Sequence, residues 1–206
     1  FGVLPVAIVT AVVANWVTWP FLRVLVLLLP LAALTFVTLG SVIHPPVLDW
    51  LREFVPDLSY TGRTDLWVFG LENLMKFPLS GYGFESFWAT PRVTGLEQPI
   101  ELSWDVRGIV HGHNSWLDAM IAFGIPGAII VFLVVAVVPI RDYLRIPQQG
   151  NAGKIAGLFI GLWLLTALAA NLESFFFRRA DPVWFLMLIS IIGLRITAHK
   201  TRQRRV

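Results

Sequence analysis

The sequence predicts an all-α integral membrane protein with about five transmembrane helices and one long loop. Of its 206 residues, 56% are hydrophobic and 14% are charged, whereas about a quarter of the residues of a soluble domain are usually charged. The mean hydropathy is +0.72. Several apolar runs approach the ~20 residues that a helix needs to cross a bilayer. No basic stripe occurs outside the last dozen residues, so nucleic acid is not an expected partner.

The predicted spans follow the apolar runs. The first, residues 3–19, ends in Trp16 and Trp19, aromatic residues that favour the membrane–water interface. A long and more polar segment, residues 44–112, follows the second span. The five predicted spans are residues 3–19, 22–43, 115–140, 155–175 and 182–196, and a basic tail follows at 197–206.

Basic residues predict which ends of the spans face the cytoplasm. They gather in the tail, in the connection at residues 141–154 and at Arg23, and cytoplasmic connections are enriched in Lys and Arg. With five spans these three regions fall on one side, so the loop at 44–112 faces the other. Because the chain starts at Phe1 inside an apolar run, without a charged leader, we expect a C-terminal fragment of a larger membrane protein.

Two short amphipathic helices are predicted within the loop. Residues 46–55 and 64–77 both place apolar side chains at helical spacing, which predicts helices at the membrane interface. Thr64 or Asp65 can start the second helix, since both side chains accept from free backbone N–H groups. The proline and glycines of residues 78–83 end it.

Titratable groups gather at the start of the third span, in the stretch VRGIVHGHNSWLDAMIAFGIPG (106–127). Ser115 and Asp118 fit the capping pattern Ser/Thr-x-x-Asp/Glu, so this span is expected to begin near Asn114 or Ser115. His113 then precedes the helix, whose positive N-terminus favours a neutral imidazole. A neutral imidazole at the membrane surface is suited to act as a general base.

The same residues have plainer explanations. His113 can be an interfacial residue satisfied by water, and the pair of His111 and His113 has no clear third ligand for a metal. The sequence therefore predicts neither a metal nor a cofactor. Gly124, which lies about three turns after the histidine, permits close helix packing, and Pro126 can kink the span below it.

Two arginines are candidates for binding phosphate groups. Arg63 precedes the helix at 64–77, and Arg107 lies six residues before His113. A guanidinium binds phosphate in a forked geometry, so two of them together can hold a pyrophosphate. Arg92 is a less favoured third candidate. For each arginine the alternative is a solvated loop charge.

An acidic residue ends the fourth predicted span. Carboxylates near membrane depth are costly and often functional, which makes Glu173 a candidate. A structural ion pair with Arg178 or Arg179 explains it equally well. Tryptophans such as Trp67 can stack on sugar faces, but an interfacial aromatic belt accounts for them too.

Three motifs in this order resemble the signature region of the O-antigen ligase and O-antigen polymerase superfamily, which includes polymerases of exopolysaccharide repeat units. The motifs are GRTDLW (62–67), PLSGYGFESFW (78–88) and HGHNSWLDAMIAFGIPG (111–127). The resemblance covers about residues 60–130, and NLESFFFRRADPVWF (171–185) is similar to the acidic motif of the exopolysaccharide branch. Trp67 stands where the ligase pattern has leucine.

The resemblance implies a protein of about a dozen helical spans in the bacterial inner (cytoplasmic) membrane, with a large periplasmic loop. It implies a metal-independent, inverting glycosyltransferase that takes a glycan from undecaprenyl pyrophosphate and transfers it to an acceptor hydroxyl. By position, His113 matches the proposed catalytic base, Arg63 the pyrophosphate-binding arginine and Arg107 the second arginine. The implied partners are the lipid-linked oligosaccharide, the bilayer and an acceptor glycan or glycolipid. Supporting candidates in the same motifs are Glu173, Asn114, Tyr82 and Trp67.

Three classes of function are compatible with the composition. A membrane glycosyltransferase is favoured over a transporter or channel subunit, because transporters usually place charges near the membrane midplane, and here they gather at one face. A membrane scaffold without chemistry would tolerate the loss of His113, Arg63 and Glu173 together. Within the family, the motif GYGFESFW (81–88) and the acidic motif favour a polymerase over a ligase that attaches glycan to lipid A core.

Overall fold

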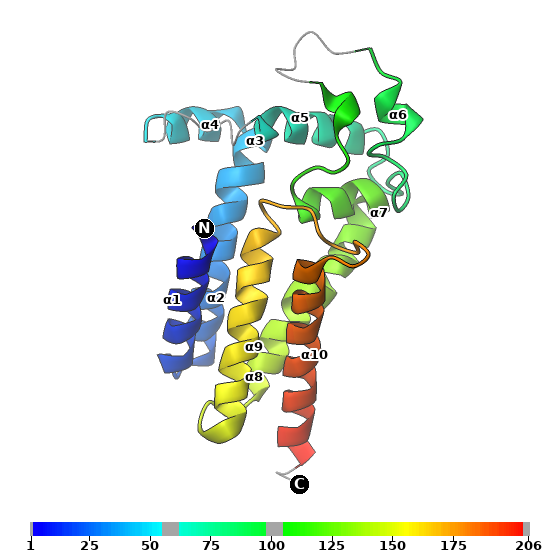
Figure 1. Ribbon diagram of the computed structural model, residues 1–206. Coiled ribbons are helices and arrows are strands. Elements are labelled where there is room, and N and C mark those ends of the chain that lie inside the picture. Colours follow the sequence, from blue (N-terminus) through cyan, green and yellow to red (C-terminus); the bar gives the residue numbers. More distant parts are fainter. Residues whose placement is uncertain (1, 55–61, 98–104, 204–206) are drawn as a thin grey trace. The chain divides into compact units, whose positions relative to one another are not determined.

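The computed structural model describes residues 2–54, 62–97 and 105–203, and in these residues every regular element is a helix. The predicted all-α fold is therefore confirmed (Figure 1). Short π-helical turns extend α2 and α7. The helices are α1 (Val3–Trp16), α2 (Pro20–Thr35), α3 (Ser41–Ile43), α4 (Pro45–Arg52), α5 (Arg63–Leu74), α6 (Pro91–Thr94), α7 (Ser115–Phe132), α8 (Val138–Arg145), α9 (Gly150–Ala169) and α10 (Pro182–Gln203), with π-turns at Phe36–Gly40 and Leu133–Val137 and a 3₁₀ turn at Val106–Gly108.

Among the described residues, four continuous helical stretches are long and apolar enough to cross a membrane: Pro20–Ile43, Ser115–Arg145, Gly150–Ala169 and Pro182–Gln203. The first predicted span is shorter than expected, since α1 ends at Trp16 where Val17 becomes extended. The carbonyl groups at that end are not left unsatisfied, because Nε of Arg23 donates to the oxygen atoms of Ala14 and Val17, each at 3.1 Å.

The chain folds into two compact units. The first contains the residues up to Ala33, Phe132–Ala169 and the residues from Phe175 onward. In it α9 packs against α1 and α10, and α10 packs against α8. Small residues allow these close approaches, because a Cβ atom on Gly193 would meet the ring of Phe159.

The second unit contains Leu34–Val131 and Ala170–Ser174. The long loop contributes to the core of this unit and does not only lie at the membrane interface. Helix α5, which is part of the loop, carries Trp67, and the side chain of Trp67 is completely buried. The loop and the first half of α7 fold around one apolar cluster. The buried members of this cluster are Leu39, Trp67, Phe69, Leu74, Phe87, Val93, Val106, Leu117 and Ile121.

A turn of the loop docks onto a kink in α7. Gly124 has φ 68° and ψ 176°, so the helix is interrupted there, two residues before Pro126, to which the kink was assigned from the sequence. The freed backbone groups bind residues 78–83: the amide of Ile125 donates to the oxygen of Pro78 at 2.7 Å, and the amide of Tyr82 donates to the oxygen of Ile121 at 2.8 Å. The glycine thus serves contact with a loop rather than with another helix.

Replacing Gly124 by alanine is expected to destabilise this junction strongly. A Cβ atom there would collide with the backbone of Leu79, and the left-handed backbone alone costs an alanine about 1–2 kcal/mol. We expect a lower yield of monodisperse protein and a lower midpoint of thermal unfolding. Gly108→Ala is the matched control, because a Cβ atom at Gly108 meets nothing within 4 Å. Equal behaviour of the two variants would contradict the packing described.

Several predicted boundaries were wrong. Helix α5 starts at Arg63 behind Gly62, whose φ is 86°, so neither Thr64 nor Asp65 begins it. Helix α10 continues to Gln203, beyond the predicted end of the fifth span at 196. The fourth span ends at Ala169 and not at 175, so Glu173 lies in a connecting segment.

Candidate functional site

Three side chains from distant parts of the sequence meet in the second unit. Arg63 is the first residue of α5; its Nη2 lies 2.7 Å from Oε1 of Glu173, and its Nη1 donates to the carbonyl oxygen of Leu172. The other carboxylate oxygen, Oε2, lies 3.0 Å from Nδ1 of His113. Glu173 therefore bridges the arginine and the histidine. We call these three residues the Arg–Glu–His cluster.

The cluster is accessible enough to meet a substrate. The side chains of Arg63, His113 and Glu173 retain 24%, 31% and 50% of their exposure. They are neither sealed in the core nor fully solvated. A bound molecule could therefore reach them, while ion pairs in this partly shielded position are screened less than fully exposed ones.

Hydrogen bonds from His113 and Arg63 favour the ionised form of Glu173. Burial raises the pKa of its carboxyl group, but hydrogen bonds from His113 and Arg63 outweigh burial, and the net pKa is lowered. Glu173 is therefore ionised at neutral pH and can only accept hydrogen bonds. A neutral His113 facing it must carry its hydrogen on Nδ1, which leaves the lone pair on Nε2.

The backbone at His113 is strained in a way that the sequence did not reveal. Its φ is 51°, in the left-handed region that few residues other than glycine adopt. Such outliers persist only where surrounding contacts over-determine them, and they cluster at functional sites. The amide of His113 donates to Nδ1 of His111 at 3.3 Å, and the two rings lie 4.2 Å apart between centroids. These contacts between His111 and His113 were not predicted from the sequence.

The helix that follows His113 is capped by Asn114. Its Oδ1 accepts from the amides of Trp116 and Leu117 at 3.1 and 3.0 Å. The predicted start of the third span is confirmed. The capping residue is Asn114, however, and not the pair of Ser115 and Asp118 that the sequence pattern indicated. Asp118 instead accepts from the amide of Gly112 at 3.0 Å and from Nε1 of Trp88 at 2.7 Å.

The segment carrying Glu173 is tied to the start of α7. Nδ2 of Asn114 donates to the oxygen of Asn171 at 3.0 Å, and the amide of Asn114 donates to Oγ of Ser174 at 2.9 Å. Oγ of Ser115 donates to the oxygen of Glu173 at 2.7 Å. Carbonyl groups that would have continued α9 are used here, which explains why that helix stops early. These contacts fix Glu173 opposite His113.

Trp67 supports the cluster rather than lining it. Its ring is fully buried, and its Nε1 donates to the carbonyl oxygen of Gly112 at 2.9 Å, directly before His113. Asp118 closely approaches Gly112, because a Cβ atom there would lie 2.5 Å from Oδ1 of Asp118 and would force that side chain to shift. Stacking of Trp67 on a sugar face, as considered from the sequence, is incompatible with this burial.

The remaining candidates lie outside the cluster. Arg107 pairs with Asp105, with Nη2 2.6 Å from Oδ2. Hydrogen bonds between the two lower the pKa of Asp105 and raise the pKa of Arg107. The hydroxyl of Tyr82 donates to the oxygen of Asn73 at 3.1 Å, and the guanidinium of Arg92 lies over the tyrosine ring, 5.5 Å from its centroid. Among the described residues, no group of three His, Asp or Glu side chains could share a metal ion.

Comparison with known proteins places the chain in a family. The model of the O-Antigen ligase family matches residues 2–132. Over 128 residues the chain is 32% identical to the exopolysaccharide production protein ExoQ of Rhizobium meliloti (strain 1021), an alignment that covers 60% of this chain and 28% of that relative. No solved structure matches the chain significantly. Since the family model matches more than half of its residues, the chain belongs to the O-antigen ligase family of membrane proteins.

Proposed function

We propose that this chain carries the transfer site of a membrane glycosyltransferase, which moves a glycan from undecaprenyl pyrophosphate to an acceptor hydroxyl. The observation that carries the proposal is the Arg–Glu–His cluster: a histidine whose Nδ1 meets a carboxylate, next to an arginine. A base and an anion-binding group are the two functions that such a transfer requires. Membership of the O-antigen ligase family supports the same chemistry.

In the proposed reaction Nε2 of His113 takes the proton from the acceptor hydroxyl as its oxygen attacks the anomeric carbon of the donor sugar. The bond from that carbon to the pyrophosphate oxygen breaks, and its electron pair leaves with undecaprenyl pyrophosphate. The imidazolium that forms is stabilised by the ionised Glu173. One displacement of this kind inverts the anomeric configuration.

Arg63 is proposed to stabilise the charge that develops on the departing pyrophosphate. A guanidinium has five N–H donors, and the contacts to Leu172 and Glu173 use one each from Nη1 and Nη2. The remaining donors can meet phosphate oxygens while the position of Arg63 is held. Since the leaving group is already activated, the proposed reaction requires no metal ion. Arg107 remains a proposed second contact, which would have to exchange Asp105 for the substrate.

The site is proposed to face the periplasm. Basic residues lie at the helix ends of the first unit: Arg23 near the start of α2, Arg145 at the end of α8, and Lys200 and Arg202 at the end of α10. Because cytoplasmic connections are enriched in such residues, these ends are assigned to the cytoplasm. The long loop between α2 and α7 then lies on the opposite face of the inner membrane.

Within the family we propose an exopolysaccharide or O-antigen polymerase, which uses a second lipid-linked repeat unit as acceptor. The similarity to a protein of exopolysaccharide production supports this choice. A ligase that uses lipid A core as acceptor is the alternative. The two leave different products in cells: loss of a polymerase leaves single repeat units, and loss of a ligase leaves long chains on the carrier.

Glu173→Gln tests whether the carboxylate works through His113. The amide has nearly the same shape, but it cannot stabilise an imidazolium and can donate to Nδ1, which favours the wrong tautomer. We expect kcat to fall by about 10²- to 10⁴-fold with little change in KM.

Glu72→Gln is the matched control, because Glu72 is an exposed carboxylate on α5 of the same unit. It should retain the kcat and the KM of the unmodified protein. A fall in activity of Glu173→Gln that is matched by lost thermal stability, with the kcat of the remaining folded protein unchanged, would make Glu173 a purely structural ion-pair partner and overturn its positioning role.

A further inference from the structure

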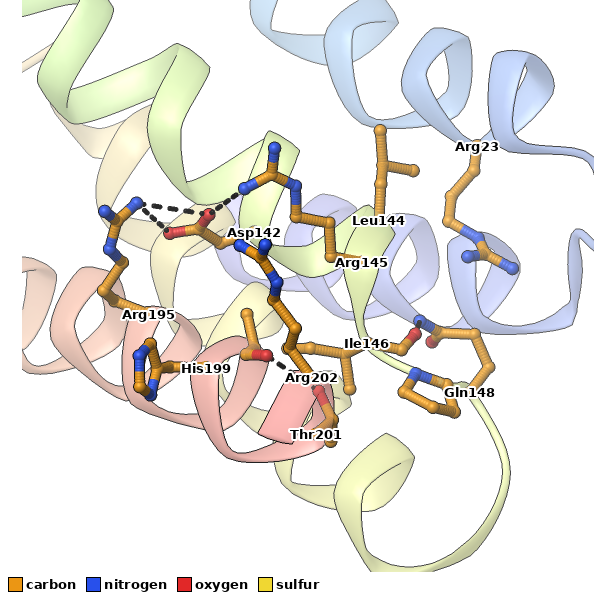
Figure 2. Close-up of a pocket in the computed structure, with 12 residues that line it drawn as sticks. Arg23, Asp142, Leu144, Arg145, Ile146, Gln148, Arg195, His199, Thr201 and Arg202 are labelled. Atoms are coloured by element: carbon orange, nitrogen blue, oxygen red, sulfur yellow. Dashed lines mark hydrogen bonds and ion pairs between the residues drawn. The ribbon is translucent and has the colours of Figure 1, made fainter. Parts of the chain in front are cut away.

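An open pocket of about 760 Å³ lies in the first unit, and none of its lining residues belongs to the proposed transfer site. Figure 2 shows it at the ends of α8 and α10, near the start of α2. Its described lining contains four arginines and a single carboxylate. The residues that line it are Arg23, Asp142, Leu144, Arg145, Ile146, Pro147, Gln148, Arg195, Ala198, His199, Thr201 and Arg202.

The positive charge of the pocket exceeds what its carboxylate can neutralise. Asp142 is buried, and one of its oxygens lies 3.2 Å from Nη1 of Arg195 and the other 3.9 Å from Nη1 of Arg145 (Figure 2). Arg141, which does not line the pocket, lies 3.1 Å from the same carboxylate. One negative charge is therefore shared among three guanidinium groups, and Arg202 adds a fourth nearby.

The arginines of the pocket differ in what they contact. Arg23 is buried and donates to the carbonyl oxygens of α1. The side chains of Arg145 and Arg195, by contrast, are 60% and 59% exposed. Arg202 is exposed as well, and Figure 2 shows its side chain extending into the pocket from α10. Three cationic groups thus converge on one open volume with only Asp142 between them.

Apolar surface adjoins these cations on the same helix. Ile192 and Ile196 of α10 are 55% and 49% exposed, within one turn of Arg195. Arg195 and Arg202 lie in the last three turns of a helix that is apolar enough to cross a membrane. A ligand that combines an anionic head with an apolar chain would satisfy both surfaces. Basic pockets between the cytoplasmic ends of membrane helices bind anionic lipid head groups in this way.

We propose that this pocket binds the phosphate group of an anionic phospholipid, with the phosphate between Arg145, Arg195 and Arg202 and the acyl chains along α10. Guanidinium groups recognise phosphate oxygens through paired N–H donors, and the bound phosphate supplies the negative charge that Asp142 alone does not. The site is independent of the proposed glycan transfer. A soluble phosphate compound shares the head-group chemistry but would make no use of the apolar surface.

Lipid binding to the purified protein in detergent tests the proposal. Native mass spectrometry would compare phosphatidylglycerol with zwitterionic phosphatidylcholine and with inorganic phosphate. The test variants are Arg145→Gln and Arg202→Gln, singly and together, and Arg141→Gln is the control, because it removes an equal charge beside Asp142 without touching the pocket. Each test substitution should weaken phosphatidylglycerol binding about fivefold, and both together about 25-fold.

The outcomes separate the sources of the ligand. Preferential binding of phosphatidylglycerol that the test variants lose and Arg141→Gln retains would support the lipid site. Binding of inorganic phosphate with the same arginine dependence, and none of the lipid, would keep the anion site but overturn its assignment to a lipid. Equal binding of both lipids, or an equal loss in Arg141→Gln, would overturn the proposal.

Discussion

Replacing His113 by alanine is expected to abolish the long glycan chains of the host if the proposed function holds, while leaving the abundance of the protein in the membrane unchanged. The proposed role of the imidazole is removal of the acceptor proton, and a positioned base contributes about 10²- to 10⁴-fold to the rate. Alanine also removes the contact between Nδ1 and Glu173. The measurement is to delete the gene in its host, restore it with either version, and resolve lipid-linked and surface glycans by size on a gel.

His44→Ala is the control for this experiment. His44 is an exposed histidine at the start of α4, and its side chain makes no capping hydrogen bond. Its replacement should leave the glycan pattern unchanged. Single repeat units that still reach their final acceptor in His113→Ala would identify a polymerase, whereas long chains retained on the carrier would identify a ligase. Full complementation by His113→Ala would refute the assignment of the base.

Arg63→Lys is expected to lose most of the transfer activity, although it preserves the positive charge. The guanidinium holds Leu172 and Glu173 through two different nitrogen atoms and still has donors for a phosphate. A single ammonium group cannot reproduce this fork. Loss of one such transition-state contact typically costs about 10²- to 10³-fold in kcat. Rates should be measured with a lipid-linked donor and the purified protein.

Arg52→Lys controls for a general sensitivity to this exchange. Arg52 is 58% exposed and, within the part of the chain that the structure describes, pairs with Asp49 at 3.4 Å, so its replacement should be neutral. If Arg63→Lys also retained the rate of the unmodified protein, the forked contact would have no catalytic role, and Arg63 would be a structural partner of Glu173.

The sequence was sufficient to predict the helical spans, because their length and apolar composition are set by the bilayer. It did not predict that the long loop shares a core with the start of α7. Trp67 and Phe69 were assigned to an interfacial helix, and their burial depends on contacts with residues such as Leu117, far along the chain. The end of the fourth span was missed for a similar reason. Residues 170–173 are compatible with a helix, but their carbonyl groups are claimed by Asn114, Ser115 and Arg63.

The members of the cluster were predictable as candidates but not as a group. Arg63 and His113 follow from the family motifs. For Glu173, a structural ion pair with Arg178 or Arg179 explained the sequence as well as a role in the site did. Only the fold shows that one carboxylate contacts both Arg63 and His113. No local signal in the sequence marks the left-handed backbone of His113. The basic pocket was also not predicted, because its arginines lie on three separate helices.

The central proposal is that His113, positioned by Glu173, acts as the base when a glycan is transferred from a lipid pyrophosphate to an acceptor hydroxyl. The most direct measurement uses the purified protein in liposomes with an undecaprenyl pyrophosphate-linked oligosaccharide, in the presence of a metal chelator, and follows the release of undecaprenyl pyrophosphate together with the glycan product. The account predicts turnover by the unmodified protein that is insensitive to the chelator and at least about 10²-fold slower in His113→Ala. Turnover that survives in His113→Ala would contradict it.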